Sequence, residues 1–162
     1  MLARGLFSAL VTLAPCAAAG AQDEFLKQRA EYEAESNPVD KAKILARLGS
    51  HELAAVRALL NEGDEEKALA ALQRYRDAIR DTTESLAATG INAARRPAGF
   101  KELQISLRQS IRRLDDLILS LQQDVRPWFR AVRSDLETAE NTLIDRLFPA
   151  PPPRRPRSAS SQ

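Results

Sequence analysis

The side chains that could support catalysis or metal binding are few in this sequence. The chain of 162 residues contains one His, His51, and one Cys, Cys16. A structural zinc site needs several Cys or His ligands, and a di-iron bundle needs paired Glu-x-x-His units. His51 is followed by Glu52 but has no second imidazole at ligand spacing. We therefore expect His51 to be a surface or rim residue, and we expect no metal site.

Two further catalytic patterns are weak or absent. Asp115 and Asp116 are adjacent carboxylates, but neighbours on a helix point about 100° apart, so they cannot share a proton without another chain segment. We expect them on a solvated helix face. The sequence contains no G-x-G-x-x-G and no G-K-S/T phosphate loop. The sequence therefore predicts a protein that is not an enzyme and that carries no cofactor.

The candidate binding residues cluster around Pro127. Trp128 and Phe129 are an aromatic pair in an aromatic-poor chain, and they are expected to close one end of the fold or to anchor an interface. The arginines that share one helix face beside this pair are Arg126, Arg130 and Arg133. Two interpretations are open for these arginines. They form an anion-binding surface for lipid headgroups or envelope polymers, or they are solvated and neutralised by nearby carboxylates.

The elements that position these residues are predicted to be helices. Four segments carry apolar residues at helical spacing, at residues 38–61, 64–89, 99–123 and 125–148. Asn37 and Pro38 are typical of an N-cap and a first helical residue, and Asp64 can cap the second segment. Their similar lengths and short connections predict an all-α fold, an antiparallel up-down-up-down four-helix bundle with a short extra N-terminal helix.

Two parts of this assignment leave alternatives. Pro127 either separates two helices, with Asp124 as N-cap of the second, or kinks one long helix. Residues 22–37 are acid-rich and predict a short helix and linker. The apolar stripe of that helix is thin, and it consists of Phe25, Leu26, Ala30 and Ala34.

The first residues have the pattern of an export signal. Arg4 precedes a short apolar run, and Ala19 and Ala21 form an A-x-A site that makes Gln22 the first mature residue. Two alternatives remain open. Cys16 follows Leu-Ala-Pro, which resembles a bacterial lipobox except for the proline, and the uncharged residues 5–21 approach the length of a membrane anchor.

Export restricts both the chemistry and the location of the protein. Cleavage after Ala21 removes the only Cys, so the mature chain forms no disulfide, and no N-x-S/T sequon is present. These features favour a periplasmic or secreted bacterial protein. All 22 acidic residues precede position 146, so the body is net negative, while the Pro- and Arg-rich residues 149–162 predict an extended, disordered tail. Nucleic-acid binding is therefore not expected.

Two resemblances follow from short motifs. Residues 62–69 (EGDEEKAL) resemble the turn of a tetratricopeptide repeat, but no second copy lies at a 34-residue period. Residues 38–148 resemble uncharacterised exported bacterial helical-bundle proteins, through a G-D-x-x-x-A-L turn, the segment PAGFK at 97–101 and RRLDD at 112–116. This resemblance implies a shared fold and no activity.

The predicted function is therefore non-enzymatic: binding or structural work in the cell envelope, with an unknown protein or envelope component as partner. The alternatives are a periplasmic chaperone or stress-type binder, and a membrane-attached lipoprotein anchored through Cys16.

Overall fold

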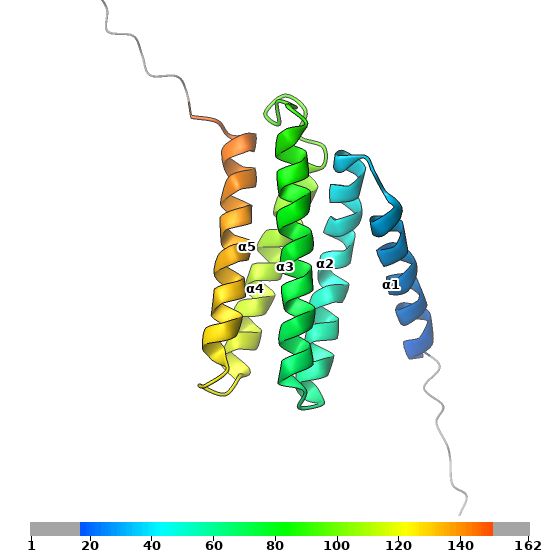
Figure 1. Ribbon diagram of the computed structural model, residues 1–162, viewed down its shortest axis with the longest axis vertical. Coiled ribbons are helices and arrows are strands. Elements are labelled where there is room, and N and C mark those ends of the chain that lie inside the picture. Colours follow the sequence, from blue (N-terminus) through cyan, green and yellow to red (C-terminus); the bar gives the residue numbers. More distant parts are fainter. Residues whose placement is uncertain (1–16, 151–162) are drawn as a thin grey trace, which may run out of the picture.

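The computed structural model describes residues 17–150, with side chains from Asp23 onward, and every regular element in this range is a helix. Figure 1 shows the helices packed side by side, with the N-terminal helix along one edge. The helices are α1 (Ala17–Ala34), α2 (Pro38–Asn61), α3 (Glu65–Ala88), α4 (Phe100–Ser120) and α5 (Arg126–Leu147). The all-helical fold and its bundle-like packing are as predicted.

Side-chain caps fix the starts of α2 and α3 where the sequence predicted them. The Asn37 side chain accepts a hydrogen bond from the Val39 backbone N–H at 2.9 Å, and Asp64 accepts one from the Lys67 backbone N–H at 3.1 Å. Each cap satisfies a backbone donor that has no partner within the helix. These short polar side chains therefore define both helix starts locally.

The joint at Pro127 is a turn between two helices. α4 ends at Ser120 and α5 begins at Arg126. The prediction that Asp124 caps α5 is wrong, because Val125 occupies the N-cap position and no side-chain cap is formed. The turn is closed from the other side: the Arg126 guanidinium donates to the carbonyl oxygens of Leu121 (2.9 Å) and Leu119 (3.1 Å) at the end of α4.

The four long helices do not all pack in sequence order. α2 contacts α3 and α4, and α5 contacts α4 and α3, so α3 and α4 lie on a diagonal although they are consecutive. Residues 89–99 connect them at the end of the bundle opposite the α2–α3 and α4–α5 turns (Figure 1). This longer link therefore joins two helices that do not pack as direct neighbours, unlike the α2–α3 and α4–α5 turns.

The interior contains a close approach between α2 and α4. A Cβ atom on Gly49 would lie 2.8 Å from the Ser106 hydroxyl oxygen and 2.8 Å from the Tyr75 hydroxyl oxygen. Tyr75 reaches across from α3 and shares a 3.0 Å hydrogen bond with Ser110, while Ser106 donates to the Ala46 carbonyl at 2.7 Å. Burial raises the pKa of Tyr75 to about 12, so this hydroxyl is neutral.

The α1 helix docks through a face that the sequence did not predict. Leu26 is 59% exposed, and Ala30 and Ala34 are also exposed, so Phe25 is the one member of the expected apolar stripe that packs against the core. The inward face carries Arg29 and Tyr32 beside Phe25. Arg29 and Tyr32 form hydrogen bonds to α2 and α3, and the Phe25 and Tyr32 rings pack against the core.

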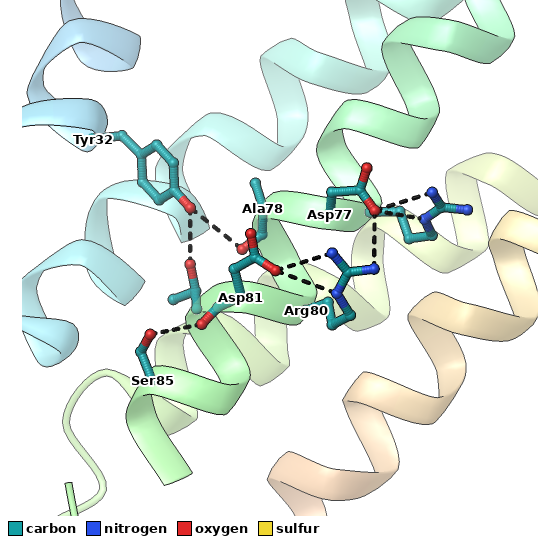
Figure 2. Close-up of polar contacts among 8 residues, drawn as sticks. Tyr32, Asp77, Ala78, Arg80, Asp81 and Ser85 are labelled. Carbon is teal, nitrogen blue, oxygen red and sulfur yellow. Dashed lines mark hydrogen bonds and ion pairs between the residues drawn. The ribbon is translucent and has the colours of Figure 1, made fainter. Parts of the chain in front are cut away.

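Two contacts fix this side of α1. Arg29 donates to the buried Glu52 carboxylate at 2.8 Å. The Tyr32 hydroxyl reaches toward Ala78 of α3 (Figure 2). It lies 3.3 Å from the Ala78 carbonyl oxygen and 3.0 Å from the Thr82 hydroxyl.

Candidate interaction surface

The structure separates the two aromatic residues of the predicted cluster. Phe129 is fully buried and belongs to the core, while the Trp128 side chain is 62% exposed. The two residues of the pair therefore have different surroundings: Phe129 packs inside the bundle, and Trp128 does not. Adjacent helical residues point about 100° apart, which allows one ring to pack inward while the next stays outside.

The three predicted arginines have different surroundings. Arg126 closes the α4–α5 turn, and Arg133 forms ion pairs with Asp115 of α4 and with Glu137 one turn along α5. Arg130 is exposed and forms no ion pair with any residue of the described range. The face therefore does not act as one cationic cluster, because two of its three members hold the bundle together.

The remaining residues singled out by the sequence have structural contacts or lie at the chain start. Asp115 pairs with Arg133, and the His51 ring lies 6.2 Å from the Phe25 ring between centroids. Ala19, Ala21 and Gln22 belong to the first turns of α1, so the predicted boundary at residue 21 falls inside a helix. The alanine-rich residues of this segment have high helix propensity. Cys16 and residues 151–162 lie outside the described residues.

The outer face of α3 carries a chain of charges that neutralise one another. Arg80 lies between Asp77 (3.3 Å) and Asp81 (3.1 Å), as Figure 2 shows. Arg76 pairs with Asp77 at 3.0 Å and with Asp135 of α5 at 3.4 Å. A groove of about 530 Å³ lies between α3 and α5 beside this chain. Its two arginines already have carboxylate partners, so it offers little net charge to a ligand.

A second groove, on the α2–α4 seam, has a different character. It consists of two hollows of about 590 Å³ and 220 Å³ that share Ser50 and Arg113, and we call it the α2–α4 groove. Its floor is formed by small and apolar side chains from both helices: Ala46, Leu53, Ala54, Ile105, Ser106 and Leu117. Ile105 is 45% exposed there. α2 and α4 approach closely at Gly49, so only small residues fit between the two helices at that point.

The rim of the α2–α4 groove is basic. Its cations are Lys43, Arg47, Arg57 and Arg113, and its only carboxylate is Glu102. Glu102 accepts a hydrogen bond from the Gly99 backbone N–H at 2.8 Å, which commits it to the start of α4. Lys43 and Arg47 have exposed partners in Asp40 and Glu31, whereas Arg57 and Arg113 form no ion pair within residues 23–150.

The sequence did not predict this groove, although a signal was present. Residues 43, 47, 50, 54 and 57 recur at steps of four and three along α2, and all are basic or small. This pattern describes a basic face of α2. It does not show that α4 adds Arg113 and Ile105 opposite it, because that pairing depends on tertiary packing.

Within the described range, no helix combines the length and apolar character needed to cross a membrane, and no group of three or more His, Cys, Asp or Glu side chains could hold a metal ion. The chain matches no family model, and neither a curated protein nor a solved structure is similar to it. The geometry of the α2–α4 groove and of the α4–α5 end is therefore the basis for a functional proposal.

Proposed function

We propose that this protein is an exported, non-enzymatic binding protein of the bacterial envelope, and that it binds its partner in the α2–α4 groove. The observation that carries the proposal is the pair Arg57 and Arg113, two exposed guanidinium groups that form no ion pair within residues 23–150 and lie beside an apolar floor. Unpaired cations at a groove favour an anionic partner and speed its association.

The remaining parts of the proposal come from the sequence and from the connections. The A-x-A site before Gln22 supports export, and the resemblance to exported helical-bundle proteins supports the same location. The turns at alternate ends of the bundle (Figure 1) favour an up-down-up-down course of α2 to α5, with α1 as an additional N-terminal helix.

Site-specific photo-crosslinking in living cells tests the binding part. A photoreactive residue in place of Gln109, which lines the groove, is expected to capture a discrete envelope component. The same residue in place of Ala94, exposed in the α3–α4 connection, is the matched control. Capture that is equal at both positions, or absent at Gln109, contradicts the groove as the binding site.

Mass spectrometry of the protein from a periplasmic fraction tests the export part. An unmodified chain that begins at Gln22 is the expected form. A chain found in the cytoplasm with its first residues intact contradicts export, and a lipid-modified Cys16 supports the membrane-attached alternative instead.

A second candidate function is a chaperone-type binder, and one observation favours it. Leu119 and Trp128 are 73% and 62% exposed on either side of the α4–α5 turn. Exposed apolar side chains at one end suit transient contact with unfolded clients. This function predicts that the protein suppresses aggregation of an unfolded client at near-stoichiometric ratio and that Trp128→Ala removes the effect.

A further inference from the structure

The α2–α4 groove has a length, a charge and a floor that together restrict its occupant. From Lys43 to Arg57 it follows about four turns of α2, or roughly 21 Å. This span matches a short helical segment. The shared hollow residues Ser50 and Arg113 make the groove continuous along this length.

The charge favours an acidic occupant. Arg57 and Arg113 line one hollow from opposite helices, and no carboxylate lines that hollow. A ligand that brings carboxylates to this point gains charge-assisted hydrogen bonds without displacing an existing ion pair. The α3–α5 groove lacks this property, because Arg76 and Arg80 are already paired.

The floor favours a helix over a polar polymer. The Ser106 and Ser110 hydroxyls bond internally to the Ala46 carbonyl and to Tyr75, so they are not free for a ligand. Ile105 and the alanines present apolar surface instead. A helix satisfies its own backbone groups and needs only an apolar stripe to cover such a floor, as in other helix-in-groove complexes. The docking of α1 beside α2 shows that this bundle already accommodates a helix on a neighbouring seam.

We propose that the α2–α4 groove binds an acidic amphipathic helix of a partner protein, with its apolar stripe on Ile105 and its carboxylates at Arg57 and Arg113. This inference rests on the proposed function, since it names the partner class of the same groove. A helix with apolar residues at i, i+4 and i+7 and Glu on both flanks has the required form.

Fluorescence anisotropy with a defined peptide tests this proposal. The probe is a labelled peptide of about 21 residues, long enough to span the groove as a helix, with one leucine stripe flanked by Glu. Its scrambled sequence is the composition-matched control. We expect micromolar binding by the protein in the form that accumulates in the cell, and at least tenfold weaker binding of the scrambled peptide. Equal binding of the two peptides overturns the proposal.

Variants locate the binding on the groove. The double variant Arg57→Glu/Arg113→Glu is expected to bind the peptide at least tenfold more weakly than the wild type. Arg95→Glu/Arg96→Glu makes the same charge change in the exposed α3–α4 connection. Its affinity for the peptide is expected to stay within twofold of the wild-type value. Circular dichroism confirms that both variants remain folded. An equal loss in both pairs indicates a general charge effect and contradicts the proposal.

Competition experiments distinguish binding of an acidic amphipathic helix from binding of any polyanion. Polyphosphate and polyglutamate supply negative charge without an apolar stripe, and Ile105→Ser removes apolar floor without changing charge. We expect Ile105→Ser to bind the peptide more weakly than the wild type. We expect neither polymer to displace the peptide at matched charge concentration. Polymers that compete as well as the peptide identify a polyanion site and overturn this inference. If a photoreactive residue at position 109 captures a partner but the peptide does not bind, the groove remains the binding site and only the proposed class of partner is wrong.

Discussion

The Arg29 guanidinium lies 2.8 Å from the Glu52 carboxylate and thereby joins α1 to α2 at a point where Glu52 is 6% exposed. Glu52 is buried, and Arg29 is its ion-pair partner. The pair therefore joins α1 to α2 and also balances a buried charge. Removing one member of a buried pair costs more than an exposed pair contributes, because the other charge is left desolvated. This pair is therefore a contact on which the docking of α1 depends.

Arg29→Met is expected to destabilise the docking of α1. Glu52 then loses its partner, and we expect a loss of about 1–3 kcal/mol, below the cost for a fully buried pair because Arg29 is about one-third exposed. Hydrogen exchange of residues 25–34 measures this loss directly. Arg47→Met removes the exposed pair with Glu31 and serves as control, with an expected cost of about 0–1 kcal/mol. Equal exchange in both variants would show that the buried pair has no special role.

Glu52 also makes stability depend on pH. Burial raises the pKa of the Glu52 carboxyl in the folded chain, and the positive charges of Arg29 and Arg74 only partly oppose it. The folded state then binds the proton more tightly than the unfolded state. The contribution of Glu52 is therefore greatest below its unfolded pKa and is lost as pH rises through the raised value.

The measurement compares the wild-type protein with Glu52→Gln in urea unfolding from about pH 4 to about pH 7, a window that begins near the ordinary pKa of a Glu carboxyl. We expect the wild type to lose stability relative to the variant as pH rises across this window. A difference in unfolding free energy that stays constant with pH, or that changes in the opposite direction, contradicts the assignment.

Gly49→Ala is expected to destabilise the fold through overpacking. The added Cβ would lie 2.8 Å from both the Ser106 and Tyr75 hydroxyl oxygens, and both hydroxyls are held by hydrogen bonds. Inserting a methyl group into a packed interior costs about 1–3 kcal/mol. Thermal unfolding measures the loss, with Ser50→Ala on the exposed side of α2 as control. Combining Gly49→Ala with Tyr75→Phe should cost less than the sum of the two single changes, and strict additivity would argue against the clash.

Phe129→Ala is expected to cost far more stability than Trp128→Ala. Phe129 is fully buried, and its truncation should cost about 3–5 kcal/mol because it leaves a cavity. Trp128 is 62% exposed, and its truncation should change stability by about 0.5 kcal/mol or less. Urea unfolding of the two variants checks both values. A large loss for Trp128→Ala would place its ring in the core instead.

Much of the fold is determined by the sequence itself. Apolar spacing defines α2 to α5, and the caps Asn37 and Asp64 define two of their starts, because these signals depend on residues one or two turns apart. The single His and the single Cys likewise restrict the chemistry, because no folding of the chain can assemble several such ligands at one site. Each of these helix signals lies within a single segment of the chain, so it can be recognised without knowledge of the tertiary structure.

The tertiary structure alone decided which surfaces meet. It placed α3 and α4 on a diagonal, turned the polar side of α1 inward to reach Glu52 and Thr82, and left Trp128 outside while burying Phe129. It also brought Arg113 of α4 opposite Arg57 of α2, which formed the basic groove. Such pairings depend on the relative rotation and position of whole helices. Helical periodicity identifies the apolar side of each helix, but it does not identify the neighbour of that side or the polar groups that the neighbour offers.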